Sequence, residues 1–114
     1  MVIGGLQTAS GKCISQIERD GSWTYLYDEN GKRYKTLSTS SIGDVKGWSC
    51  DFFVAESGSW IYIYDSDGRR TKTLSKSSVG NIIAVSGSTF TSKSGSWIYT
   101  YNSDGKRINT RAAR

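Results

Sequence analysis

Apolar and polar residues alternate along three stretches of this chain in the same way. In the first stretch, every second position is aromatic, at Trp23, Tyr25 and Tyr27, and the positions between hold Thr24 and Leu26. Successive side chains of a β-strand point to opposite faces, so this pattern predicts a strand with apolar groups on both faces. We therefore expect each such strand to lie between two neighbouring sheets.

The stretch belongs to a block that occurs three times, as GSWTYLYDENGKR, GSWIYIYDSDGRR and GSWIYTYNSDGKR. The tryptophans of the copies are Trp23, Trp60 and Trp97, so consecutive copies lie 37 residues apart. A fixed period in the range of roughly 20–50 residues is typical of repeat proteins. We predict a single repeat domain over residues 1–114, with repeats at approximately 1–38, 39–75 and 76–114.

Each repeat is expected to form four short antiparallel strands. The pairs Asn30-Gly31, Asp67-Gly68 and Asp104-Gly105 favour a type I′ hairpin turn, in which both central residues have positive φ. Serine-rich segments at 38–41 and 75–78 are predicted to be loops. The predicted strands are Val2–Thr8, Cys13–Arg19, Trp23–Tyr27 and Arg33–Leu37, then Ile42–Gly47, Phe52–Glu56, Trp60–Tyr64 and Arg70–Leu74, and finally Val79–Val85, Thr89–Lys93, Ser96–Tyr101 and Arg107–Arg111.

The order of strands within a repeat matches one blade of a β-propeller. The first strand carries a glycine, the third is apolar, and the fourth is charged, as suits an exposed sheet edge. The segment WIYIYDSDGRR resembles the third strand, turn and fourth strand of propeller blades of the NHL type and related families. This resemblance covers about a third of each copy and implies an all-β fold of antiparallel blades.

Three blades are too few for a ring, because propellers typically have four to eight. We expect two chains to associate as a homodimer that forms a six-bladed propeller with two-fold symmetry, the commonest symmetry of homo-oligomers. The alternative is a monomeric β-trefoil, in which three four-stranded repeats close one barrel. The apolar residues on both faces of the third strand favour the propeller.

Aromatic residues and arginines recur in the repeats and suggest a binding surface for sugar rings or nucleic-acid bases. The alternatives are a tryptophan core between blades, arginines paired with Asp28 or Asp65, and a core position for Trp48. We predict a multivalent, lectin-like module that binds a glycan or another small polar ligand. The candidate ligand-binding residues are Trp23, Tyr25, Arg33, Trp60, Tyr62, Arg70, Trp97, Tyr99, Arg107 and the unrepeated Trp48.

The formal net charge of +5 keeps nucleic acid or another polyanion as an alternative ligand. The basic residues are spread through the repeats, however, so the charge supports this alternative less than the aromatic residues support a glycan. A protein-interaction or structural ring is the third hypothesis.

Catalysis has little support, because the chain has no histidine. Cys13 and Cys50 are the only cysteines and are too few for a zinc site, so we expect no enzyme activity, no metal and no cofactor. We expect these cysteines to be two half-buried thiols, with a disulfide as the alternative.

No apolar run reaches the roughly 18 residues of a membrane span, and the first residues do not form a secretory signal. These features favour a cytoplasmic location without a membrane partner.

Overall fold

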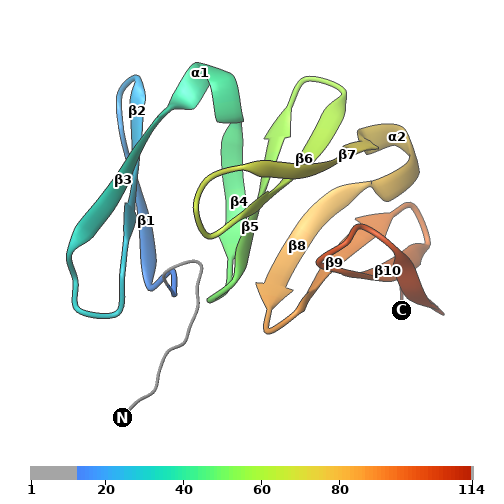
Figure 1. Ribbon diagram of the computed structural model, residues 1–114. Helices are drawn as coiled ribbons and strands as arrows, with labels where there is room; N and C mark the ends of the chain where they lie inside the picture. The colour runs from blue at the N-terminus through green and yellow to red at the C-terminus, as the bar shows by residue number, and fades with distance from the viewer. Residues whose placement is uncertain (1–12, 114) are drawn as a thin grey trace, which may run out of the picture.

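The computed structural model describes residues 13–113 as three antiparallel sheets that stand side by side (Figure 1). Consecutive strands pair within each sheet, so every sheet is a simple meander. The sheets contain β1 (Gln16–Asp20), β2 (Trp23–Tyr27) and β3 (Arg33–Ser38); then β4 (Asp44–Trp48), β5 (Phe52–Ser57), β6 (Trp60–Asp65) and β7 (Arg70–Ser75); and finally β8 (Asn81–Ser86), β9 (Thr89–Ser94), β10 (Trp97–Asn102) and β11 (Arg107–Ala112).

These strands confirm the prediction of an all-β fold with antiparallel repeats. The second and third repeats each contain the four expected strands. The first repeat contributes three strands, and its predicted strand Val2–Thr8 lies outside the described residues. The fourth strands β3, β7 and β11 lie at sheet edges, and Arg33, Lys35, Arg70 and Lys72 on them are exposed as expected.

Two short helices connect the sheets, where the sequence predicts loops. The single-turn helix α1 (Thr39–Ile42) follows β3, and α2 (Lys76–Val79) follows β7. The loop prediction is wrong because four-residue serine-rich segments are too short to show a helical period. Ile42 and Val79, predicted to begin strands, instead end these helices with 4% and 1% of their surface exposed.

The hairpin turns also differ from the prediction. The N–H of Gly31 donates to the carbonyl oxygen of Asp28, so the turn spans four residues with Glu29 and Asn30 at its centre. Only glycines have positive φ among the described residues, which excludes a type I′ turn at Asn30-Gly31. The glycine instead follows the turn with φ of 76°, next to a β-bulge at Leu26/Tyr27.

One side chain in each repeat fixes this turn. The Asp28 Oδ1 atom accepts hydrogen bonds from the backbone N–H groups of Asn30 and Lys32, at 2.9 and 3.0 Å. Asp65 and Asn102 accept the corresponding pair of bonds in the second and third repeats. Because Asp and Asn both offer an oxygen acceptor at this position, the turn tolerates the exchange between them.

The hydrophobic core lies between the sheets, and it covers the second sheet on both faces. On β6, Ile61 and Ile63 pack towards the third sheet, whereas Tyr64 packs towards the first. This arrangement confirms that the third strand of the middle repeat lies between neighbouring sheets. One cluster contains Phe52, Val54, Ile61, Ile63, Val79, Phe90 and Tyr101; the other contains Ile14, Leu26, Ile42, Phe53, Ala55 and Tyr64.

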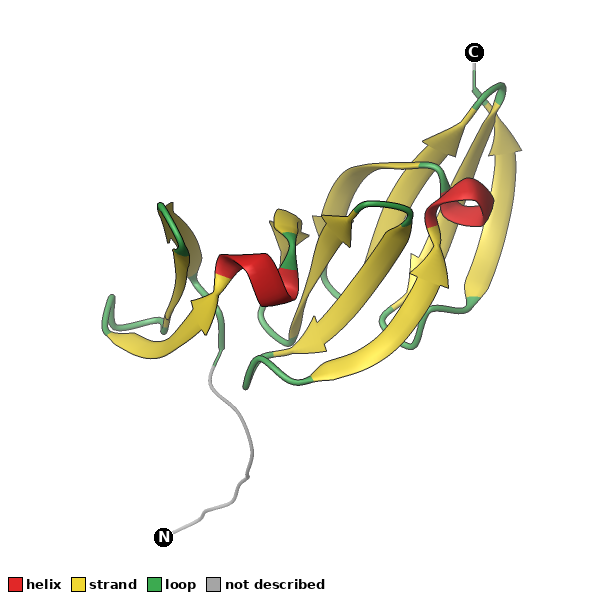
Figure 2. Ribbon diagram, turned by 90° about the horizontal axis from the view of Figure 1, so that it is seen from above, coloured by secondary structure: helices red, strands yellow, loops and turns green. Residues whose placement is uncertain are grey.

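The second and third sheets come closest at their first strands. In residues 13–113, β4 and β8 make the most extensive contact between strands of different sheets. A Cβ added to Gly47 on β4 would lie 2.7 Å from Val85 Cγ2 on β8, so only glycine fits at this approach. Figure 2 shows the second sheet between the other two when the molecule is viewed from above.

Candidate functional site

Two clefts between consecutive sheets repeat with the period of the sequence. Cleft 1, of about 440 Å³, lies between the first and second sheets, and cleft 2, of about 560 Å³, lies between the second and third. Nine residues that line cleft 1 have counterparts 37 positions later that line cleft 2. The repeat therefore builds the same recess twice, from a Gly-Ser turn, a short helix and the end of the next sheet's second strand.

Small and hydroxyl-bearing residues dominate both clefts. Ser22 and Ser57 line cleft 1, and their counterparts Ser59 and Ser94 line cleft 2. Gly58 belongs to both clefts and has φ of 60°, as the tight turn before β6 requires. Hydroxyl groups both donate and accept hydrogen bonds, so these walls suit a ligand with many hydroxyl groups.

The charges of the two clefts differ. Asp44 and Glu56 line cleft 1, whereas Asn81 and Lys93 occupy the corresponding positions of cleft 2. Lys76 also lines cleft 2, and its Nζ atom donates a hydrogen bond to a Glu56 carboxylate oxygen. Cleft 1 is therefore lined by two carboxylates and the Arg19 guanidinium, and cleft 2 by two lysines.

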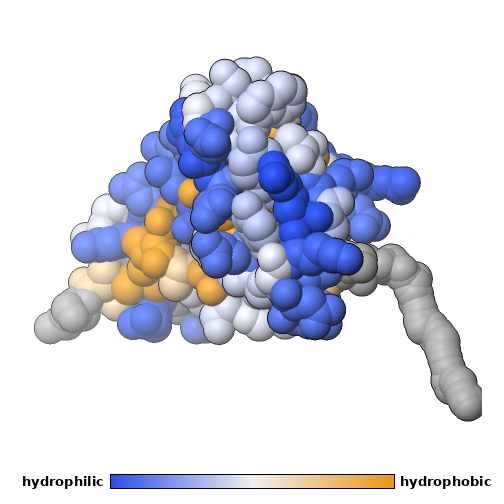
Figure 3. All heavy atoms as spheres, turned by 90° about the vertical axis from the view of Figure 1, so that its left-hand side faces the viewer, coloured by the Kyte–Doolittle hydropathy of each residue, from blue (hydrophilic) through white to orange (hydrophobic). Residues whose placement is uncertain are grey.

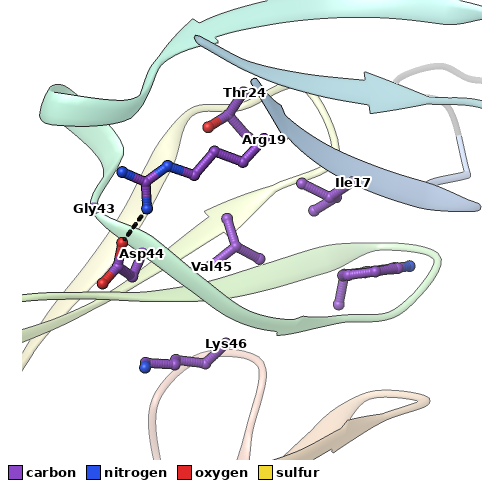
Figure 4. Close-up of a pocket in the computed structure, with 8 residues that line it drawn as sticks. Ile17, Arg19, Thr24, Gly43, Asp44, Val45 and Lys46 are labelled. Atoms are coloured by element: carbon purple, nitrogen blue, oxygen red, sulfur yellow. Dashed lines mark hydrogen bonds and ion pairs between the residues drawn. The ribbon is translucent and has the colours of Figure 1, made fainter. Parts of the chain in front are cut away.

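A third recess, of about 310 Å³, adjoins cleft 1 and is lined in part by Ile17, Val45 and Trp48 (Figure 4). Arg19 and Asp44 line both spaces, and the Arg19 Nη1 atom lies 2.8 Å from Asp44 Oδ1. This ion pair links β1 to β4 across the gap. Both side chains are about 60% exposed, so the pair positions the groups without adding much stability.

Trp48, the unrepeated candidate, lies half-buried between the first and second sheets. Its ring packs against the core that joins these sheets, and its Nε1 atom donates to the Ser15 carbonyl oxygen at 3.4 Å. The sequence leaves a surface position and a core position open for this residue. In the structure, Trp48 both packs against the core and lines the third recess.

The repeated tryptophans are not core residues. Trp23, Trp60 and Trp97 are 51%, 48% and 50% exposed, so the alternative of a tryptophan core between sheets is wrong. Their equal exposure in all three repeats shows that it is a property of the position itself. Trp60 pairs with Ser57, which lines cleft 1, and Trp97 pairs with Ser94, which lines cleft 2, so these two rings lie beside the clefts.

The structure brings the predicted arginines and tyrosines together in a way that the sequence does not predict. The guanidinium carbon of Arg70 lies 3.8 Å from the centre of the Tyr62 ring. Arg33 and Arg107 lie over Tyr25 and Tyr99 in the same manner, at 4.1 and 4.4 Å. Cation–π contact of this kind holds the guanidinium against the sheet. The sequence offers only ion pairs or ligand clamps as roles for these arginines.

Sequence reasoning also misses Tyr34, whose hydroxyl links two sheets. It donates a hydrogen bond of 2.6 Å to the Ser66 carbonyl oxygen in the hairpin of the second sheet. Burial, followed by the negative charge of Asp67, raises the pKa of Tyr34 to about 12. Similarly, the Tyr64 hydroxyl donates to Ile42 at the end of α1, and burial raises its pKa. The phenols at the sheet junctions therefore stay protonated and act as donors.

A disulfide joins Cys13 and Cys50, whose Cα atoms lie 4.4 Å apart. The prediction of two thiols is therefore wrong. The bond ties the segment before β1 to the turn between β4 and β5, and the N–H of Ile14 donates to the Cys50 carbonyl oxygen beside it. The disulfide thus fixes the first sheet against the second.

The described part of the chain shows neither a metal-binding cluster nor a membrane-spanning helix. Residues 13–113 contain no cluster of three histidine, cysteine, aspartate or glutamate side chains that could hold a metal ion. Over the same residues, no helix has the length and apolar character needed to cross a membrane.

This chain was compared with family models and with curated proteins. No family model matches this chain, and a search of curated proteins finds no similar sequence. The resemblance to NHL-type blades therefore stays a prediction, and the repeated clefts carry the functional argument.

Proposed function

We propose that this chain is a non-enzymatic binding module that takes up glycans in the repeated clefts between its sheets. The observation that carries this proposal is the recurrence of one hydroxyl-lined recess at a 37-residue interval, as clefts 1 and 2. Sugars present many hydroxyl groups, which match the serine hydroxyls and backbone groups of these walls. The half-exposed Trp60 and Trp97, beside clefts 1 and 2, offer flat apolar surfaces on which sugar rings stack.

Repetition supports a polymeric or branched glycan as the ligand. Two similar sites on one rigid chain turn the second binding event into an intramolecular one, which raises the overall affinity without new contacts. The different charges of the clefts suit a ligand that carries both neutral and acidic sugars. Cleft 1 with Asp44 favours neutral residues, and cleft 2 with Lys93 favours acidic ones.

The cationic wall of cleft 2 favours a polyanion as the second candidate function. Lys76 and Lys93 both line this cleft. Glu56 accepts a hydrogen bond from Lys76 and reduces the net positive charge there. Binding that depends on these lysines through charge alone would weaken steeply with salt, whereas stacked and hydrogen-bonded sugars would not.

We also propose that the three sheets are blades of a β-propeller and that a second chain completes a six-bladed ring. The hydrogen bonds of each sheet stay within one repeat, which supports separate blades over the shared barrel of a β-trefoil. The close approach of β4 and β8 supports a hub at the first strands. The charged β7 and β11 would then form the outer edges, as in a blade.

A glycan array followed by titration tests the binding proposal. We expect sugars to change the tryptophan fluorescence with little dependence on salt, and Trp60→Ala to weaken binding at least tenfold. Ile83→Ala serves as the matched control, because Ile83 is also exposed (54%) and, unlike Trp60, has no cross-strand partner that lines cleft 1 or 2. Retention on heparin alone, lost at high salt, would support the polyanion hypothesis and exclude the glycan one.

The disulfide bears on the cellular location. Disulfides persist in oxidising compartments and are rare in the cytosol. The Cys13–Cys50 bond therefore supports an exported protein over the cytoplasmic one that the sequence favours. An exported module would also meet surface and extracellular glycans.

A further inference from the structure

Both junctions between sheets in this chain follow one rule. The tyrosine face of a sheet packs on the aliphatic face of the sheet before it. Tyr64 of the second sheet packs in one cluster with Leu26 of the first. Tyr101 of the third sheet packs in the other cluster with Ile61 and Ile63 of the second. Such nearest-neighbour packing is what stabilises repeat proteins.

The surroundings of the hairpin glycine in each repeat show whether another sheet packs against the tyrosine face of that repeat. A Cβ on Gly68 would lie 3.0 Å from Leu37 Cδ2 of the first sheet, and one on Gly105 would lie 3.4 Å from Leu74 Cδ2 of the second. At Gly31, their counterpart in the first repeat, the described part of the chain places nothing within 4 Å. Within residues 13–113, the tyrosine face of the first sheet is thus left without the neighbour that the other two have.

The aliphatic face of the third sheet lacks its neighbour in the same way. Ile108 holds the position that Tyr34 holds in the first repeat. Tyr34 reaches across to Ser66 of the following sheet, whereas Ile108 is 56% exposed. Ile98, the counterpart of the fully buried Ile61, is only half-buried.

The two free faces carry different charges. Glu18 and Asp20 lie beside Tyr25 and Trp23 on the first sheet, at the positions of Ala55 and Ser57 in the second. Figure 3 shows the side of the molecule that carries the first sheet, where blue hydrophilic residues flank a paler strip and an orange apolar patch lies at the lower left.

On the third sheet, Lys93 and Arg111 flank Ile98 as its cross-strand neighbours. In the second sheet the corresponding neighbours of Ile61 are Glu56 and Leu74. Both free faces thus combine apolar groups with charge: two carboxylates and Arg33 on the first sheet, and two basic side chains on the third. This complementarity favours contact between the faces over contact of either face with its own kind.

We propose that these faces are the two halves of a third junction, formed between two copies of this chain. The first sheet of one copy packs on the third sheet of the other, and the two-fold axis repeats the contact, so no free face remains. This inference rests on the propeller ring proposed above and names its contact residues. Glu18 lies against the Lys93–Ile98–Arg111 row of the second copy.

Closure would also create a further pair of binding clefts. In cleft 2, Ser59 on the second sheet faces Ser94 and Gly95 on the third. At the new junction the counterparts are Ser96 of one copy and Asp20 and Gly21 of the other. The dimer therefore holds six related clefts, two of which need both chains.

Charge reversal with light scattering tests this junction. Wild-type protein should have twice the chain mass of 12.6 kDa. Glu18→Arg, and separately Lys93→Glu with Arg111→Glu, should each weaken dimerisation by on the order of tenfold or more. Combining all three changes should restore the dimer. Lys106→Glu, at an exposed hairpin away from both faces, is the control and should leave the dimer intact.

The outcomes separate this inference from glycan binding. A wild-type monomer, an open polymer, or a dimer that no charge reversal weakens would each overturn the junction. Sugar titration of Glu18→Arg reports independently, because Glu18 lines neither cleft 1 nor cleft 2 and both clefts lie within one chain. A monomeric variant that still binds sugar, with fewer sites per chain than the dimer, supports both proposals. A dimer that binds no sugar keeps the junction and overturns the function.

Discussion

The hydroxyl of Tyr34 on β3 lies 2.6 Å from the Ser66 carbonyl oxygen and donates a hydrogen bond to it across the first junction. Ser66 is buried and Tyr34 is half-buried, so water replaces the bond only in part when it is lost. We predict that Tyr34→Phe lowers the free energy of unfolding by about 1 kcal/mol. Urea unfolding at neutral pH measures the change, and an unaltered transition midpoint would show that the bond contributes nothing.

The same residue predicts a loss of stability at high pH. Burial and the charge of Asp67 raise its pKa from 10.0 to about 12 in the folded chain, whereas the unfolded chain keeps the ordinary value. The unfolded state therefore releases its proton first as pH rises. The contribution of Tyr34 to stability is complete below pH 10 and disappears between pH 10 and 12.

Comparison of Tyr34→Phe with wild type isolates this effect from the other tyrosines. Burial raises the pKa of Tyr64 and Tyr101 as well, so both proteins should lose stability above pH 10. The decline should be smaller in Tyr34→Phe, when urea midpoints are measured below and above pH 10. Equal declines in both proteins would contradict the raised pKa of Tyr34.

Reduction of the disulfide should destabilise the chain. Cys13 and Cys50 are 37 residues apart, and closing a loop of this length stabilises a protein by up to about 4 kcal/mol. Thermal unfolding with and without a reducing agent should show a clear drop in Tm. The double variant Cys13→Ser, Cys50→Ser should have the Tm of the reduced protein, and the reducing agent should not change that Tm. A wild-type Tm that does not respond would mean that the bond does not form.

Removal of one stacked guanidinium should lower the free energy of unfolding by a small but measurable amount. Arg70 lies over Tyr62 at an exposed edge, where a cation–π contact is worth about 0.5–1 kcal/mol. We predict a loss of stability of this size for Arg70→Ala and a partial loss for Arg70→Lys, which keeps the charge without the planar group. Arg69→Ala, at the neighbouring exposed turn residue, is the control. Equal effects at both positions would argue against a specific contact with Tyr62.

The alternation of side chains made the strands predictable. A strand has a period of two, so Trp60, Tyr62 and Tyr64 could be assigned to one face and Ile61 and Ile63 to the other without a structure. The structure confirms the strands and their antiparallel pairing. It also shows why the tryptophan position differs from the tyrosines. Trp60 pairs with Ser75 at the very end of its strand, where the neighbouring sheet no longer covers it.

Features that depend on distances between repeats were not predictable. Cys13 and Cys50 carry no local signal for a bond, and it is the packing of the first sheet on the second that brings their Cα atoms within 4.4 Å. The clefts are of the same kind, because Ser22 and Ser57 face one recess only after two sheets have packed. The repeat period did contain one clue, since any site between two copies must recur 37 residues later.

The most direct test of the glycan-binding account is the number of sugar sites per chain. Calorimetric titration with an oligosaccharide chosen from the array should show saturable binding at more than one site, largely unchanged by salt. Ser59→Tyr should fill cleft 2 and reduce the number of sites while leaving the fold intact, because Ser59 is exposed at the turn before β6. Absence of saturable sugar binding in the wild-type chain, or binding limited to polyanions at low salt, would contradict the account.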